Sequence, residues 1–201
     1  SPSLLGAGIV AGLLAASPVA AAIIAVPADH PTIQAALDAA VAGDTIEVDS
    51  GTYMEKLEFP ASGTPGLPIT LRGKPGAPSR PVLDGTGVPG ANMILIDSKS
   101  HVAVVGFEIR NNLAVNDGSG VRVIGAGSAI AIRDNRIHEM RGQHAMGVPV
   151  YATEPAPISG LVIDGNEIYD CDPATSEAVA INGNVDGFEV TGNVVRDVDN
   201  I

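Results

Sequence analysis

Hydrophobic and polar residues alternate one by one along much of this chain. In the stretch DTIEVDS, Ile46 and Val48 fall on one side and acidic residues on the other, and in EKLEFPA the inward pair is Leu57 and Phe59. The stretch PITLRG follows the same rule. A period of two indicates β-strands with one buried face. The pattern therefore predicts short strands in succession, joined by turns rich in Gly and Pro.

A short phrase then recurs at nearly constant spacing, in the stretches GFEIRN, DNRIHE, GNEIYD and GNVVRD. The steps between the aligned aliphatic residues are 28, 31 and 27 residues, and those residues are Ile109, Ile137, Ile168 and Val195. Each phrase follows another alternating stretch, and no helical pattern intervenes. A repeat of this length built from strands predicts a solenoid of parallel sheets, with coils about 4.8 Å apart.

An asparagine stands two residues before the aligned aliphatic in three of these repeats, at Asn135, Asn166 and Asn193. In a stacked coil the three side chains would lie one above another, where each amide can satisfy buried turn groups of its neighbours. Phe107 takes this position in the first full repeat. We therefore predict a structural asparagine ladder that starts at the second repeat.

Two N-terminal segments depart from the strand pattern. Residues 1–26 are small, apolar and uncharged, and Ala20 and Ala22 offer a signal-peptide cleavage pattern. We interpret this segment as an export leader, with a membrane anchor as the alternative. Export would place the protein outside the cell or in the periplasm. Apolar spacing next predicts a short amphipathic helix over residues 31–42, with Pro31 in its first turn and Gly43 as its stop.

Composition narrows the classes of partner. The formal net charge is −12 and no basic stripe is present, which argues against nucleic-acid binding. An acidic protein can hold an acidic ligand through a divalent cation, and carboxylate oxygens suit Ca²⁺. The single cysteine, Cys171, excludes an intrachain disulfide and is interpreted as a small buried core residue.

Two long stretches carry a resemblance to known proteins. The first is VPADHPTIQAALDAAVAGDTIEVDSGTYMEKLEFPASGTPGLPITLRGKPG, and the second is SEAVAINGNVDGFEVTGNVVRDVDNI. Both resemble right-handed parallel β-helix proteins related to pectate lyases. The resemblance implies an all-β, single-stranded right-handed β-helix over residues 27–201 with a short capping helix. It also implies a secreted, often Ca²⁺-dependent protein that acts on polysaccharides. Because nothing after Val195 is typical of a cap, we expect the chain to stop within the solenoid.

The resemblance leaves three functions open. The first is a polysaccharide lyase-like enzyme that acts on acidic, uronate-containing polymers by β-elimination. The second is a non-catalytic surface adhesin or glycan-binding module, and the third is a uronate C5-epimerase, which shares the proton abstraction. The chain's lysines, Lys56, Lys74 and Lys99, match no catalytic motif of the family. The expected partner is an acidic polysaccharide, with the protein a monomer and not membrane-bound once its leader is removed.

Members of this family bind sugar along the outer face of their first sheet, so residues that point outward there are candidates. We expect this sheet to begin with the strand of Ile46 and Val48. Eliminative cleavage needs Ca²⁺ or Arg to neutralise the substrate carboxylate, a base to remove the neighbouring C–H proton, and an acid or water to protonate the leaving oxygen. Arg122 and His144 are the catalytic candidates. The candidates for substrate binding are Tyr151, which can stack on a sugar ring, Asn182 and Asp97.

Carboxylates gather in the stretch YDCDPATSE. Asp170, Asp172 and Glu177 are the candidate ligands of a Ca²⁺ ion there. The spacing of these residues matches neither an EF-hand loop nor a Ca²⁺-binding nonapeptide repeat.

Overall fold

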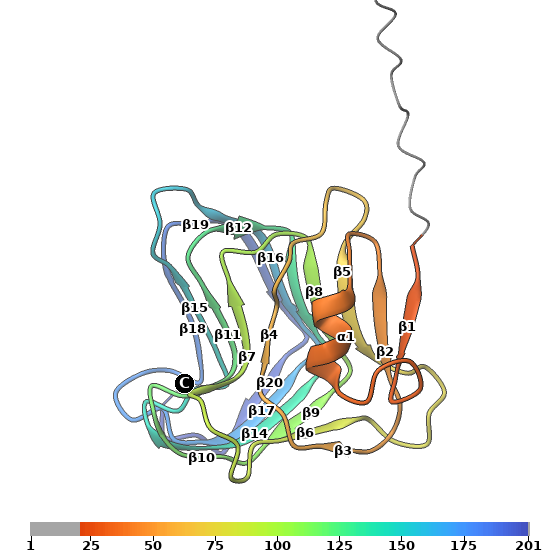
Figure 1. Cartoon of the computed structure of the whole chain (residues 1–201). Helices are drawn as coiled ribbons and strands as arrows, with labels where there is room; N and C mark the ends of the chain where they lie inside the picture. The colour runs from red at the N-terminus through yellow and green to blue at the C-terminus, as the bar shows by residue number, and fades with distance from the viewer. Residues whose placement is uncertain (1–20, 201) are drawn as a thin grey trace, which may run out of the picture.

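Strands of successive repeats stack on one another to form three sheets that enclose one apolar core (Figure 1). The computed structural model describes residues 21–200. Every pairing between named strands is parallel, and the chain passes from one sheet to the next in each coil. The predicted fold class is confirmed: the protein is an all-β parallel β-helix of about 5 turns with very little helix.

The largest sheet, called sheet A, runs through the whole solenoid. Its strands are β1 (Ile23–Val26), β2 (Thr45–Val48), β5 (Ile69–Gly73), β8 (Val102–Val105), β12 (Gly127–Ser128), β13 (Ile130–Arg133), β16 (Ile158–Asp164) and β19 (Val185–Thr191). Both β12 and β19 pair with β16.

The second sheet, sheet B, contains the repeated phrases. Its strands are β3 (Thr52–Tyr53), β6 (Val82–Asp84), β9 (Glu108–Arg110), β10 (Asn112–Asn116), β14 (Arg136–Gln143), β17 (Glu167–Cys171) and β20 (Val194–Arg196). The repeat alignment is confirmed by the register, since Ile137 pairs with both Ile109 and Ile168, and Ile168 pairs with Val195.

The third sheet, sheet C, carries the outward face that the sequence singles out. Its strands are β4 (Leu57–Glu58), β7 (Asn92–Asp97), β11 (Ser119–Ile124), β15 (Val148–Ala152) and β18 (Val179–Gly183). One prediction about this sheet is wrong. Ile46 and Val48 lie in β2 of sheet A, and sheet C begins with Leu57 in β4. Alternation alone gives a strand's two faces and not its partner, so it could not distinguish these strands.

The core is built from inward-facing aliphatic residues of all three sheets. Leu57, Phe59, Ile109 and Phe107 are at most 2% exposed, as the alternation predicts. Cys171 belongs to the same core, and burial raises the pKa of its thiol to about 12. The thiol is therefore a packing group at neutral pH.

The three asparagines form a ladder of hydrogen bonds at the turn between sheets A and B. The Oδ1 of Asn166 accepts from the backbone N–H of Asn135 at 3.0 Å and from its Nδ2 at 3.1 Å. The Oδ1 of Asn193 accepts from the same two groups of Asn166, both at 2.9 Å. The Oδ1 of Asn135 accepts from the N–H of Phe107, so the ladder ends where asparagine gives way to phenylalanine. These bonds satisfy backbone groups that the tight turn would otherwise bury without partners.

Among residues 21–200 the structure has one short helix, α1 (Ile33–Ala39), which packs near the first strands (Figure 1). Its apolar face buries Ile33, Ala36 and Leu37, as the spacing predicts. The helix is shorter than predicted. Thr32 is its N-cap and accepts from the N–H of Ala35, so Pro31 precedes the helix, and the backbone is already extended at Ala40. Helix ends depend on such local caps, which periodicity does not resolve.

The predicted leader of residues 1–26 overlaps the solenoid at its end. Residues 1–20 lie outside the described part of the chain. Ile23–Val26 form β1, which pairs with β2, and Val26 is 1% exposed. Sheet A therefore includes the last residues assigned to the leader. Over residues 21–200, no helix is long and apolar enough to cross a membrane.

In the last described coil, some side chains that point toward the core are exposed to solvent. Phe188 and Val190 pair with Leu161 and Ile163, which are fully buried, yet they are themselves 53% and 46% exposed. An additional coil stacked on β19 would cover these side chains. The expectation that more coils follow stays a prediction.

Candidate functional site

The outer face of sheet C presents two rows of side chains that run across its strands. Cα register places Glu58 opposite Leu95 and Leu95 opposite Arg122. We call these residues the Arg122 row. The neighbouring outward row joins Asp97, Ile124, Tyr151 and Asn182, each opposite the next. The structure thus brings the predicted residues Arg122, Asp97, Tyr151 and Asn182 onto one face.

Arg122 is held in place by the turn that precedes its own strand. Its Nη1 donates to the backbone oxygen of Asp117 at 3.1 Å, and its Nη2 lies 3.9 Å from the Asp117 carboxylate. The side chain is 15% exposed. Its Nε is buried and has no hydrogen-bond partner among the described residues. Nη1 is the guanidinium nitrogen that donates to another described residue, so Nη2 retains the capacity to donate to an incoming anion.

Tyr151, on the next strand along the sheet, packs its ring against the guanidinium of Arg122. The guanidinium carbon of Arg122 lies 5.5 Å from the centre of the Tyr151 ring, within the range of a cation–π contact. The phenol oxygen meets the Sδ of buried Met146 at 3.5 Å. The ring is half-buried, so it restricts the guanidinium and still offers an edge to a ligand.

Asp97 and Asn182 lie at the two ends of this row, with Ile124 between Asp97 and Tyr151. Asp97 accepts a hydrogen bond from Ser98 Oγ at 2.9 Å, and Asn182 is exposed. Both can bond sugar hydroxyls, since a carboxylate accepts and an amide both accepts and donates. The ion-pair partner of Arg122 is Asp117 of the preceding turn.

His144 occupies the same turn position as Asp117, one coil further on. Asn116 pairs with Gln143 in the register of β10 and β14, and the N–H of Asp117 donates to the Gln143 oxygen. Asp117 and His144 also share a left-handed backbone, with φ of 57° and 55°. His144 makes no hydrogen bond or ion pair with the Arg122 guanidinium or with Tyr151 among the described residues.

Two of the three carboxylates predicted to bind Ca²⁺ pair with an arginine instead. Arg141 donates through Nη1 to Asp172 Oδ1 at 2.8 Å and through Nη2 to Asp170 Oδ1. Glu177 is exposed. Within the described part of the chain, no group of three His, Cys, Asp or Glu side chains is placed to hold a metal ion. An arginine already neutralises two of the proposed ligands, so we leave them out of the candidate site.

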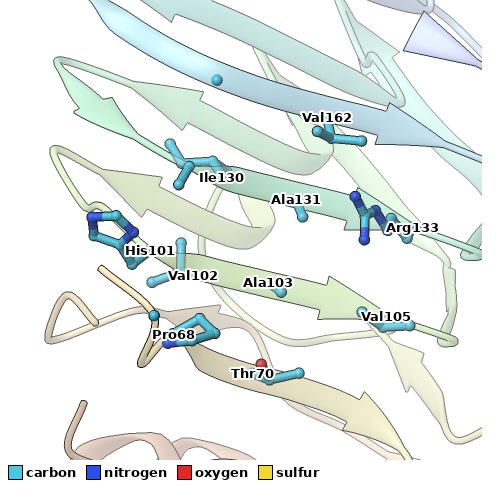
Figure 2. A pocket seen from close by; sticks show the side chains of 13 residues that line it. Pro68, Thr70, His101, Val102, Ala103, Val105, Ile130, Ala131, Arg133 and Val162 are labelled. Atoms are coloured by element: carbon cyan, nitrogen blue, oxygen red, sulfur yellow. The ribbon is translucent and has the colours of Figure 1, made fainter. Parts of the chain in front are cut away.

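Sheet A has a shallow groove of its own on its outer face, with a volume of about 450 Å³. Figure 2 shows its floor of small side chains, where Thr70, Ala103, Ala131 and Val162 pair in series across β5, β8, β13 and β16. His101 and Arg133 lie at opposite edges. The floor offers few hydrogen-bonding groups, so the face of sheet C is the better candidate for recognition of a polar ligand.

One functional candidate escaped the sequence analysis. Lys56 lines a cavity of about 370 Å³ beside the Arg122 row, together with Glu58 and Leu95. Alternation in EKLEFPA already pointed Lys56 and Glu58 away from the core. What was missing is that β4 pairs with β7, which puts Lys56 beside the outer face of sheet C.

Comparison with known proteins gives a relative in Bacillus subtilis (strain 168), the uncharacterized protein YwoF. It is 35% identical over 187 residues, which cover 85% of this chain and 38% of the relative. The chain thus spans less than half of that protein's length. No family model matches the chain.

Two solved structures have the same fold. A rhamnogalacturonan lyase superimposes with a TM-score of 0.54 at 17% identity, over 81% of this chain and 44% of its own. A GH136 lacto-N-biosidase from Eubacterium ramulus does so with a TM-score of 0.60 at 16% identity, over 78% of this chain and 36% of its own. At these identities the likeness establishes a shared β-helix architecture.

Proposed function

We propose that this protein is a secreted, carbohydrate-active β-helix protein that binds an acidic, uronate-containing polysaccharide on the outer face of sheet C and cleaves it by β-elimination. The observation that carries the proposal is the Arg122 guanidinium, positioned by Asp117 and Tyr151 on that face. The two structural neighbours, a lyase and a biosidase by name, support a carbohydrate ligand for this architecture. The apolar leader supports export, and export would bring the protein to such polymers, which lie outside the cell.

Arg122 would supply the electrostatic part of the reaction. A guanidinium pairs with a carboxylate through two parallel N–H bonds, and neutralising that carboxylate acidifies the adjacent C5–H of a uronate. A base then takes the C5 proton, a double bond forms between C4 and C5, and the C4–O bond breaks. The leaving oxygen receives a proton from an acid or from water. Asp117, which contacts Arg122, and His144, at the equivalent turn position one coil further on, are the two candidates for proton transfer.

A second function, glycan binding without cleavage, is favoured by the limited exposure of Arg122. Its side chain is 15% exposed and already contacts Asp117. A cation in this setting can fix the position of a carboxylate even where no base completes the reaction.

The test is incubation of the chain with polygalacturonate, alginate and chondroitin, each with Ca²⁺ and with a chelator. Unsaturated uronate ends absorb in the ultraviolet, so lyase activity gives a rising trace. We expect the rise to be lost in Arg122→Gln and kept in Arg136→Gln, a matched change on sheet B where Arg136 pairs with Glu167. Affinity electrophoresis on the same polymers reports binding separately.

The possible outcomes distinguish the candidate functions. Flat traces with retained binding that depends on Arg122 would establish the second function. Flat traces with a change in uronate stereochemistry by NMR would indicate the epimerase. Neither cleavage nor binding on any of the three polymers would overturn the proposal.

A further inference from the structure

The cavity at Lys56 lies at the N-terminal end of the outer face of sheet C. It is bounded by Gln34 of α1, by Lys56 and Glu58 around β4, and by Asn92 and Leu95 of β7. Figure 1 shows β4 between α1 and β7 at this end of the solenoid. The cavity therefore adjoins the face that carries Arg122 and is distinct from the groove on sheet A.

Lys56 is fixed by two acceptors and keeps a third proton for a ligand. Its Nζ donates to Asn112 Oδ1 at 2.9 Å and to the backbone oxygen of Gly90. Asn112 is fully buried and is itself held by the backbone oxygens of Ala91 and Ser119. An ammonium has three N–H donors, so one remains after these two bonds. Burial lowers the pKa of Lys56, and an anion beside it would offset that cost.

The other walls of the cavity complement the lysine. Asn92 uses its Oδ1 to accept from Ser119 Oγ at 2.7 Å, which leaves its amide N–H groups as donors. Glu58 is exposed and offers carboxylate oxygens as acceptors. Leu95 is half-buried and supplies an apolar surface between them. A cation, a donor, an acceptor and an apolar patch together match one acidic sugar: its carboxylate, its hydroxyls and the C–H face of its ring.

The register connects this cavity to Arg122. Glu58, Leu95 and Arg122 are successive Cα partners across β4, β7 and β11. Two strand spacings separate the ends of this row, which is about 10 Å. We propose that the cavity at Lys56 is a second subsite for an acidic sugar, occupied by another residue of the same glycan chain that places a carboxylate at Arg122. This inference rests on the proposed function and specifies how the chain lies: across the strands, along the axis of the solenoid.

The test is the affinity of the protein for galacturonate oligomers of increasing length, measured by calorimetry. A short oligomer reaches one cation only, whereas a longer one reaches both. We expect Lys56→Gln to weaken binding of the longest oligomer about tenfold and to leave the shortest unchanged. Lys74→Gln is the matched control, because Lys74 pairs with Asp49 at the sheet A side of the molecule and should change neither affinity.

Lys56 also hydrogen-bonds the buried Asn112, so its replacement can disturb folding. A second variant therefore tests the subsite without removing that bond. Glu58→Gln removes a negative charge from the cavity, keeps an acceptor and is exposed, so the variant should fold. We expect it to strengthen binding of the longest oligomer about two- to threefold, with the shortest unchanged.

Two failures are distinguishable. If no oligomer binds the unaltered protein, the proposed function fails and the subsite with it. If oligomers bind through Arg122 but Glu58→Gln and a folded Lys56→Gln leave the dependence on length unchanged, the subsite is wrong and the proposed function stands.

Discussion

The guanidinium of Arg122 on β11 lies over the ring of Tyr151 on β15, with its central carbon 5.5 Å from the ring centre. The two residues come from different coils and from adjacent outward rows. Asp117 holds the guanidinium from the side of the turn. The arrangement gives a cation with restricted freedom, which lowers the entropy lost when it pairs with a carboxylate.

Replacing Tyr151 by Leu should weaken binding of polygalacturonate roughly two- to fivefold, in keeping with about 0.5 to 1 kcal/mol for a partly exposed cation–π contact. Tyr151→Phe should bind normally, because the phenol oxygen meets only Met146 Sδ among the described residues. Affinity electrophoresis measures both. Tyr169→Leu is the control, since Tyr169 stacks under Arg196 at 4.1 Å on sheet B. Equal losses of polygalacturonate binding in Tyr151→Leu and Tyr169→Leu would show that the ligand does not bind specifically on sheet C.

Replacing Asn166 by Leu should reduce the free energy of unfolding by about 1 to 3 kcal/mol. The change removes the acceptor for two groups of Asn135 and the donor to the backbone oxygen of Ile132. Urea unfolding followed by circular dichroism measures the loss. Asn193→Leu should cost less, because Asn193 lies in the last coil and is only half-buried. A larger loss at Asn193 would show that the ladder does not stabilise the solenoid from its interior.

The sequence predicts the coil-to-coil relationships well. The steps between Ile109, Ile137, Ile168 and Val195 match the register of sheet B, because each repeat returns the same side chain to the same place. Alternation likewise identified the outward residues Arg122 and Tyr151. A fixed period contains this information, since stacking of equal coils converts sequence spacing into spatial adjacency.

Pairings between the first coils were harder to predict. Before β7 the chain has no repeated phrase, so nothing in the sequence shows that β4 pairs with β7 and β2 with β5. For that reason the strand of Ile46 was placed in the wrong sheet and Lys56 was overlooked. Ion pairs were not predictable either. Asp170 and Asp172 resemble metal ligands in the sequence, and only the fold reveals that Arg141 lies one coil away.

Replacing Arg141 by Gln should give a response to Ca²⁺ larger than that of the unaltered protein. The change leaves Asp170 and Asp172 as neighbouring carboxylates without their shared cation. Two neighbouring carboxylates repel each other. We therefore expect a lower thermal midpoint without Ca²⁺, and a midpoint partly restored when Ca²⁺ is added. Differential scanning fluorimetry with Ca²⁺ and with a chelator measures both. A rise of equal size in the unaltered protein would instead favour a native Ca²⁺ site at this turn.

Asp84 should make the protein less stable in acid. Burial alone would raise the pKa of its carboxyl, but hydrogen bonds from Thr86, Asn111 and Arg110 outweigh burial and hold it at about 2. The ordinary value is about 3.9, so folding favours the charged form. The stabilisation, on the order of 2 kcal/mol, is present above about pH 4 and is lost as the pH falls through about 2.

The difference in unfolding free energy between the unaltered protein and Asp84→Asn isolates this contribution from that of other carboxylates. We expect the difference to be largest at neutral pH and to shrink as the pH falls from about 5 toward 2. Urea unfolding at a series of pH values measures it. Asp186→Asn, an exposed change in β19, should give a small difference at every pH. A constant difference for Asp84→Asn would mean that the residue stabilises the coil by packing and neutral hydrogen bonds, with no contribution from its charge.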